Sequence, residues 1–162
     1  MGAKYKFQVM PNTYTQIHIQ TIFAVKKRTG LIQNEWKDEL YKYITGILKS
    51  HDHKMLAING MPDHLHVFFG IRPSQSLSDL LQDIKGGSSK WINQKRFIKQ
   101  KFEWQSGFGA FSYSKSQTST VIAYIQNQEF HHRKITFLEE YKAFLEKFEI
   151  AYDERYIFKE PA

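Results

Sequence analysis

The sequence predicts a single α+β domain in which helices pack an antiparallel β-sheet and further helices follow toward the C-terminal end. Two observations support this fold class. Segments with strand and helix periodicity follow one another in the order strand, helix, strand, strand, helix, strand. Apolar residues then recur at helical spacing in the last third of the chain. This order is typical of the ferredoxin-like, or RRM-like, sandwich with additional C-terminal helices.

Strands are predicted from alternating patterns and turn residues in four segments: 14–25, 54–60, 64–71 and 107–114. In the first segment, Ile17 and Ile19 alternate with Gln16 and Gln20, a period of two that is typical of a half-buried strand. The second and third segments are separated by Met-Pro-Asp. Pro62 fixes its own φ angle, so this tripeptide predicts a tight turn between neighbouring strands.

Helices are predicted in four segments: 35–50, 77–95, 121–133 and 137–148. Asn34, Ser76 and Thr136 stand where N-cap residues are expected. Gly86 and Gly87 cost roughly 1 kcal/mol each inside a helix, so a kink or break is expected there. The last helix has an apolar stripe made of Phe137, Tyr141, Phe144, Leu145 and Phe148.

Composition limits the possible functions. The 162 residues suffice for one core, and we interpret 1–12 as an N-terminal extension before a single domain at 13–158. A net charge of +7 and 15% aromatic residues suit a nucleic-acid partner, because cations neutralise phosphates and rings stack on unpaired bases. With no cysteine, disulfides, thiolate nucleophiles and Cys-containing zinc sites are excluded. No apolar run reaches the length of a membrane span, which predicts a cytoplasmic protein.

His64 and His66 flank Leu65 at the start of a predicted strand. Side chains two apart on a strand share a face and lie about 6.5 to 7 Å apart, so two imidazoles can converge on one ion while Leu65 faces the core. The alternative, which an isolated pair of this kind favours, is that both histidines line a solvated face. A second pair with this spacing, His51 and His53, stands at a predicted helix C-terminus and is assigned to structure, because imidazolium complements the helix dipole there.

Tyr124 and Gln128 are four residues apart in the predicted helix 121–133, which places them on one face. A phenol can attack phosphorus and an amide oxygen can join a metal shell, although a tyrosine at this spacing is usually a core residue. His131 and His132 are also possible ligands. We assign them no such role, because adjacent helix residues diverge by about 100°.

Cations and indoles form a separate set of candidates for DNA contact: Lys26, Lys27, Arg28, Lys85, Lys90, Lys95 and Arg96, with Trp91 and Trp104 as stacking surfaces. For most of them individually, a solvated face or a buried indole is the simpler interpretation.

Four motifs together resemble the single-tyrosine HUH transposases, which move small insertion sequences as single-stranded DNA and include the REP-associated tyrosine transposases. The motifs are GMPDHLHVFF, SLSDLLQDIKGGSSKWIN, GFGAFSYS and VIAYIQNQEFHH, and the similarity extends from about Thr13 to about Tyr156. The resemblance implies that His64 and His66 are the HUH metal ligands, Tyr124 on the C-terminal helices is the nucleophile, and Gln128 is the third ligand. It further implies Mg²⁺ or Mn²⁺, DNA hairpins as partners, and a homodimer that exchanges the tyrosine helix.

The expected reaction is cleavage and rejoining of single-stranded DNA through a 5′-phosphotyrosine, which stores the bond energy so that a 3′-OH can reverse the attack. In the resembled family the tyrosine helix can cross to the partner subunit, and the polar segment 114–120 could hinge such a helix outward, so the resemblance implies that Tyr124 acts in trans on the partner's histidines. Three alternatives stay open. The chain is a non-catalytic single-stranded nucleic-acid-binding module, a metal-dependent phosphoesterase that uses water, or a domesticated REP-associated enzyme.

Overall fold

The computed structural model describes residues 12–157, so the predicted N-terminal extension lies outside this range except for its last residue. The sheet contains four strands: β1 (His18–Ala24), β2 (Lys54–Met61), β3 (His64–Gly70) and β4 (Gly109–Tyr113). Their order across the sheet is β2-β3-β1-β4, and each neighbouring pair is antiparallel. The predicted α+β, ferredoxin-like fold class is confirmed.

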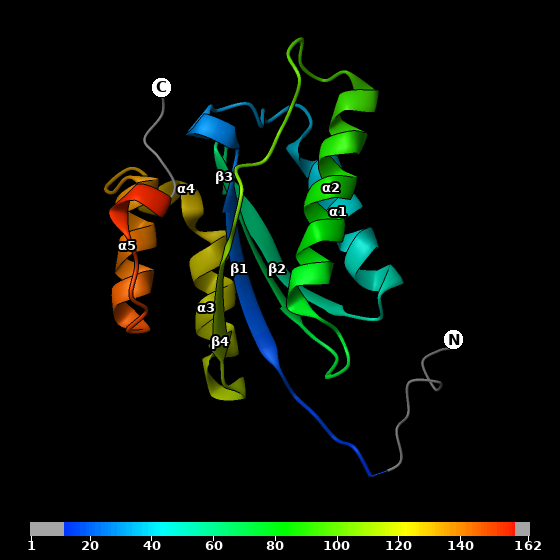
Figure 1. The fold of residues 1–162 in the computed structure, drawn as a ribbon, viewed down its shortest axis with the longest axis vertical. Coiled ribbons are helices and arrows are strands. Elements are labelled where there is room, and N and C mark those ends of the chain that lie inside the picture. The colour runs from blue at the N-terminus through cyan, green and yellow to red at the C-terminus, as the bar shows by residue number, and fades with distance from the viewer. Residues whose placement is uncertain (1–11, 158–162) are drawn as a thin grey trace.

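Helices cover both faces of the sheet (Figure 1). One face carries α1 (Lys37–Ser50) and α2 (Leu77–Lys95). The other carries α3 (Thr118–Gln126), the short α4 (Gln128–His131) and α5 (Phe137–Lys147). Short 3₁₀ turns are η2 (Lys26–Arg28), η3 (Lys115–Gln117) and η4 (Glu154–Tyr156). Within residues 12–157, no helix is both long enough and apolar enough to cross a membrane.

The face under α1 and α2 is a continuous apolar core. Phe23 of β1 and Leu65 and Phe69 of β3 are fully buried there, together with Leu40 of α1 and Ile84 of α2. Burial of each such side chain contributes about 1.5 to 3 kcal/mol relative to exposure. This face therefore supplies much of the stability of the domain.

The opposite face is also covered, which corrects one expectation. Residues 20–24 of β1 are all buried, although alternation predicted a strand with one solvated face. The cause is α3 and α5, which pack on Ile22, Phe68 and Phe111 and enclose polar side chains of the same strands. Alternation here therefore separates an apolar interior from one in which polar side chains are buried among apolar ones.

Two of the three predicted N-caps are confirmed. Ser76 and Thr136 each accept a hydrogen bond from a backbone N–H three residues on, and Thr136 forms a complete capping box. Asn34 does not cap α1. The helix begins at Lys37 after a turn, because Trp36 is buried and stacks on Phe97 with ring centroids 4.8 Å apart.

The expected break at Gly86 and Gly87 is absent, since α2 is one helix of 19 residues. A Cβ atom on Gly87 would lie 3.4 Å from Cδ1 of Ile47, so the glycine allows α1 to approach closely. Ser88 is buried beside it and its hydroxyl accepts a hydrogen bond from Trp104 Nε1 at 3.0 Å. Packing against α1 and Trp104 thus outweighs the low helix propensity of the two glycines.

A break appears instead at Asn127, which separates α3 from α4. Its φ and ψ of −100° and 24° are not those of a regular helix. At this point Asn59 of β2 donates from Nδ2 to the carbonyl oxygens of Ile125 and Gln126, at 3.1 and 3.2 Å. These bonds satisfy carbonyls at the end of α3 and fix the helix that carries Tyr124 on its own sheet.

Candidate functional site

His64 and His66 project from β3 toward α3 and α5, while Leu65 and Val67 face α1 and α2, as the two-residue period predicts. Across the sheet, His64 pairs with Ala24, a small residue that leaves room for the ring. Both histidines have no exposed surface. The expectation that they line an open face is therefore wrong, because α5 closes over them.

The Nδ1 atoms of His64 and His66 each lie within hydrogen-bond distance of a side-chain oxygen. His64 Nδ1 lies 2.7 Å from Asp63 Oδ1, and His66 Nδ1 lies 2.7 Å from Gln20 Oε1. An Nδ1–H that donates to such an oxygen leaves Nε2 as the nitrogen with a lone pair. Both Nε2 atoms are thus prepared as acceptors or ligands, and both are turned toward Glu140 of α5.

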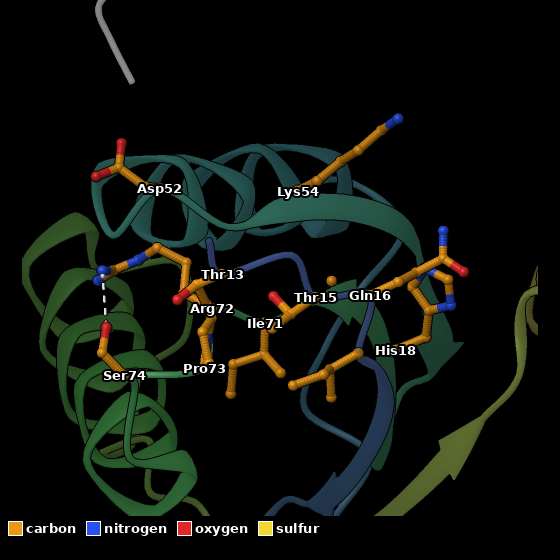
Figure 2. Close-up of a pocket in the computed structure, with 12 residues that line it drawn as sticks. Thr13, Thr15, Gln16, His18, Asp52, Lys54, Ile71, Arg72, Pro73 and Ser74 are labelled. Carbon is orange, nitrogen blue, oxygen red and sulfur yellow. Dashed lines mark hydrogen bonds between the residues drawn. The ribbon is translucent and has the colours of Figure 1, made fainter. Parts of the chain in front are cut away.

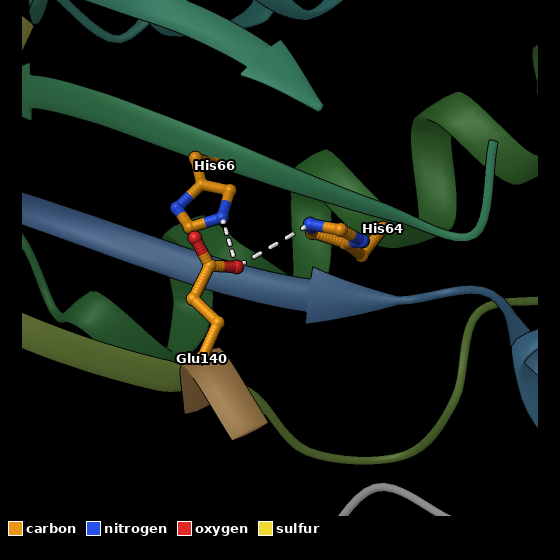
Figure 3. Close-up of side chains that lie close together, drawn as sticks. All are labelled: His64, His66 and Glu140. Atoms are coloured by element: carbon orange, nitrogen blue, oxygen red, sulfur yellow. Dashed lines mark hydrogen bonds and ion pairs between the residues drawn. The ribbon is translucent and has the colours of Figure 1, made fainter. Parts of the chain in front are cut away.

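Glu140 lies between His64 and His66 (Figure 3), and we call the residues around its carboxylate the histidine cluster. Its Oε1 is 3.1 Å from His66 Nε2, 3.6 Å from His64 Nε2 and 3.0 Å from His132 Nε2. One ligand atom from each of His64, His66 and Glu140 lies within 4.8 Å of the others. Metal–ligand bonds of about 2.0 to 2.2 Å to imidazole and carboxylate are compatible with such spacing, so this buried group could hold a metal ion.

Tyr124 and Gln128 join the same cluster. The Tyr124 hydroxyl donates a hydrogen bond to Glu140 Oε2, and Gln128 Nε2 donates to the same oxygen at 3.0 Å. Gln128 Oε1 lies 3.2 Å from His64 Nε2. All four residues that the sequence singled out therefore meet, although Tyr124 and Gln128 belong to two separate helices.

Charge in the cluster is balanced around the Glu140 carboxylate. Burial by itself would raise the pKa of Glu140, but the nearby His66, His132 and His64 outweigh it and hold that pKa below its ordinary value. The ionised carboxylate is thus favoured. Burial, followed by the Glu140 charge and hydrogen bond, raises the pKa of Tyr124 above its ordinary value.

His64 and His132 respond differently to the same surroundings. Burial lowers the pKa of His64, and the hydrogen bond to Asp63 only partly offsets this. For His132, burial acts in the same direction, but the hydrogen bond to Glu140 and its charge prevail and raise the pKa. His64 thus favours the neutral form that a metal ligand needs, and His132 favours a cation beside the carboxylate.

Sequence reasoning missed two members of the cluster. Glu140 falls at helical spacing between Phe137 and Phe144, so a charged residue occupies a core position of the C-terminal stripe. That mismatch was the available signal. His132 was assigned no role on helical geometry, but regular helix ends at His131, and this places the His132 ring 4.8 Å from the His64 ring.

The predicted DNA contacts on α2 lie on the other side of the sheet. Lys85, Lys90 and Trp91 belong to the helix that covers the apolar face. Lys85 Nζ donates to the carbonyl oxygen of Gln105 at 2.8 Å, and Trp91 stacks on Tyr43 at 4.7 Å between ring centroids. The structure gives Lys85 and Trp91 structural contacts and does not bring these three residues to the histidine cluster.

The cations that follow β1 divide into two kinds. Lys26 and Lys27 are exposed, whereas Arg28 is only 4% exposed. Arg28 Nε lies 3.8 Å from Asp63 Oδ2, and its guanidinium lies 5.0 Å from the ring centroid of Phe137. A cleft of about 560 Å³ begins here, and four of the five ionisable side chains that line it are basic, namely Arg28, His132, Arg133 and Lys134, with Asp63 as the fifth. Arg28 is thus the one predicted contact in this group that reaches the edge of the cluster.

A second hollow lies at the opposite end of the strands, where His18 pairs with Gly70 (Figure 2). It carries two cations, Arg72 and the exposed Lys54. Arg72 is engaged in structure: Nε donates to the carbonyl of His51 at 2.9 Å and a terminal nitrogen donates to Ser74 Oγ at 3.2 Å. The pair His51 and His53 lies beside it, at the C-terminal end of α1 as predicted. None of the clustered residues lines this hollow.

The site is assembled within one chain. The ring centroids of Tyr124 and His66 lie 6.1 Å apart, and Asn59 holds the end of α3 on β2. Within this one chain the tyrosine helix lies in cis, where β2 provides its bonding partners, and exchange of that helix between two subunits stays a prediction. The oligomeric state stays a prediction.

Comparison with known proteins agrees with the predicted resemblance. The family model described as transposase IS200 like matches residues 13–128. The ISDra2 transposase TnpA of Deinococcus radiodurans is 23% identical over 122 residues, which cover 70% of this chain and 84% of the relative.

Two solved structures share the fold. A Deinococcus radiodurans R1 protein assigned as a transposase has a TM-score of 0.61 and 22% identity, covering 74% of this chain and 96% of its own. A REP-associated tyrosine transposase bound to a REP hairpin has a TM-score of 0.58 and 14% identity, covering 78% and 75%. The family match spans more than half of the chain and includes the two histidines, the tyrosine and the glutamine. The chain therefore belongs to the IS200-like transposase family.

Proposed function

We propose that this chain cleaves and rejoins single-stranded DNA through a 5′-phosphotyrosine on Tyr124, with a divalent metal held at His64 and His66. One observation carries the proposal. Asp63 and Gln20 accept hydrogen bonds from Nδ1 of His64 and His66, and both Nε2 atoms therefore face Glu140. The Tyr124 hydroxyl donates to the same carboxylate. A core tyrosine needs no such paired and oriented imidazoles.

The residues fit a divalent ion. Two imidazole nitrogens, a carboxylate oxygen of Glu140 and an amide oxygen of Gln128 gather in a buried site. The oxygens suit Mn²⁺ or Mg²⁺, and because imidazole suits transition-metal ions, the set favours Mn²⁺ of the two. His64, His66 and Gln128 are the ligands that the resemblance implies, and Glu140 is a fourth candidate. When bound, the ion would polarise the scissile phosphate and stabilise charge on the leaving oxygen.

The reaction of the chain's own residues is an in-line displacement. The Tyr124 oxygen forms a bond to phosphorus and its phenol proton passes to solvent. The bond from phosphorus to the 3′ oxygen breaks, that oxygen takes up a proton from solvent, and the products are a 5′-phosphotyrosine and a free 3′-OH. Because the adduct keeps the energy of a phosphodiester, a 3′-OH can reverse the step and join strands. The hydrogen bond to Glu140 fixes the direction of the phenol, and the His132 imidazolium offsets the charge of that carboxylate.

Single-stranded DNA with hairpins is the proposed substrate. The net charge of +7 and the cleft formed with Arg28, Arg133 and Lys134 favour a polyanion next to the cluster. A structural neighbour was solved with a REP hairpin, which supports the same class of partner here. A homodimer that exchanges the tyrosine helix is retained as a proposal.

The decisive experiment compares Tyr124→Phe with the parent protein and with Tyr43→Phe, a matched change on the other face of the sheet. Single strands that cover the DNA on both sides of the gene serve as substrates, with Mn²⁺ or Mg²⁺ present. On denaturing gels the parent and Tyr43→Phe should give a covalent protein–DNA band, whereas Tyr124→Phe should give none and still bind DNA. Excess chelator should remove the band and added metal should restore it.

Other outcomes identify the alternatives. An adduct in Tyr124→Phe, or full activity in chelator, would overturn the proposed mechanism. Cleavage without any adduct would indicate a phosphoesterase that uses water, and binding without cleavage would indicate a non-catalytic module.

A further inference from the structure

A small cavity of about 260 Å³ opens beside Tyr124, between α3, α5 and the sheet. Its walls are largely aromatic and apolar, and the residues that line it are Gln20, Tyr113, Thr120, Val121, Tyr124, Ala143, Phe144 and Lys147. The volume is below the roughly 300 to 1,000 Å³ of pockets for drug-sized ligands, so one ring system fits better than a longer segment.

The cavity shares two side chains with the histidine cluster. Tyr124 contributes its ring to the cavity and its hydroxyl to Glu140. Gln20 donates from Nε2 to the Tyr113 hydroxyl at 3.0 Å, and its Oε1 holds His66 Nδ1 at 2.7 Å. A group bound in the cavity would therefore lie next to the reacting tyrosine and one hydrogen-bonded side chain away from a predicted metal ligand.

We propose that this cavity binds the base of a nucleotide that adjoins the scissile phosphate, an inference that rests on the proposed function. A phosphate attacked by Tyr124 brings its neighbouring base to the cavity mouth. Tyr113, Tyr124 and Phe144 offer aromatic surfaces for contact with a base, and Thr120 and Lys147 are exposed polar groups that suit base edges and backbone phosphate. A base can enter only when unpaired, so the cavity selects single strands.

The cavity depends on a helix that follows the family match. Ala143, Phe144 and Lys147 belong to α5, whereas the matched residues end at 128. The base preference should therefore depend on α5 as well as on the matched segment, which supplies Tyr113 and Tyr124.

The first test fills the cavity. Ala143→Trp places a large ring in it, and Ala123→Trp makes the same change at another exposed alanine, on α3, that does not line it. Strands from both sides of the gene are reacted in Mn²⁺, and the DNA attached to denatured protein is recovered and sequenced. The parent and Ala123→Trp should show a base preference next to the cleaved phosphate. Ala143→Trp should lose that preference and form adduct about tenfold less efficiently, the effect expected for one lost stacking contact.

The second test leaves the protein unchanged. Strands of the cleaved sequence are made with an abasic residue on either side of the cleaved phosphate, or three nucleotides away as a control. One adjoining position should raise the strand concentration needed for half-maximal adduct formation by about tenfold, and the distant position should not. Equal reaction of all strands, with unchanged preference in a folded Ala143→Trp protein, would overturn the cavity proposal alone. Absence of any adduct in the parent would instead reject the proposed function.

Discussion

The two faces of the sheet differ although the same strands build them. In β3, Leu65, Val67 and Phe69 enter an apolar core, whereas His64 and His66, which alternate with them, enter a polar cluster. In the apolar core, stability grows with buried area. In the polar cluster, it depends on every donor and acceptor having a partner, because a buried polar group without one costs about 1 to 3 kcal/mol. Alternate residues of one strand thus supply the apolar core and the candidate site.

This difference also concerns how the two faces respond to change. A shortened apolar side chain leaves a cavity, and the neighbours relax partly around it. A removed member of the cluster leaves the Glu140 carboxylate or an imidazole unpaired and alters the site itself. Mutations on the first face should therefore change stability, and mutations on the second should change metal binding as well.

The largest expected effect is on the apolar face. Leu65→Ala should lower the free energy of unfolding by about 2 to 5 kcal/mol, because Leu65 has no exposed surface and its removal leaves a cavity. Urea denaturation measures this change. Below the denaturation range, the affinity for Mn²⁺ per folded molecule should match the parent.

His64→Ala is the counterpart on the opposite side of the same strand. It should lower the Mn²⁺ affinity, and it should also reduce stability by about 1 to 3 kcal/mol because Asp63 loses its hydrogen-bond partner. A normal metal affinity in His64→Ala, or a lost one in folded Leu65→Ala, would contradict the division between the two faces.

The next effect concerns Glu140. Glu140→Gln keeps the shape of the side chain but removes its charge, and should weaken Mn²⁺ binding by about 10- to 100-fold in a calorimetric titration. Glu139→Gln is the matched control, because Glu139 is exposed and glutamine can replace glutamate in the capping box with Thr136. Equal metal affinities in the two variants would show that Glu140 is not a ligand.

Much of the fold follows from the sequence because local patterns encode it. The order of the elements was predicted from the alternating patterns, from the turn at Pro62 and from the N-caps, two of which are confirmed. The spacing of His64 and His66 predicted that they share one face of the sheet. Glu140 could not be paired with them by spacing, because it follows His66 by 74 positions in the sequence and belongs to a separate helix. The covering of that face by α3 and α5 is likewise a tertiary effect, which is why a solvated site was expected. Asn127 shows the same limit, since Asn59 from a distant strand bonds the end of α3.

The smallest expected effect is on α2, at the glycine pair where the sequence predicted a kink or break that the structure does not have. Gly86 lies inside α2, and a Cβ atom built there meets nothing within 4 Å. Because alanine is favoured over glycine in a helix interior, Gly86→Ala should raise the free energy of unfolding by about 0.5 to 1 kcal/mol. For a domain of this size, each kcal/mol shifts the melting temperature by about 2 to 4 °C, which differential scanning calorimetry resolves. Gly60→Ala is the contrasting variant on β2, since its Cβ would lie 2.1 Å from the His64 carbonyl oxygen and would force β3 to move beside the cluster. Gly60→Ala should therefore lose both stability and Mn²⁺ affinity. A lower melting temperature in Gly86→Ala would mean that α2 is not a regular helix at that residue, and would restore the kink expected from the Gly-Gly pair.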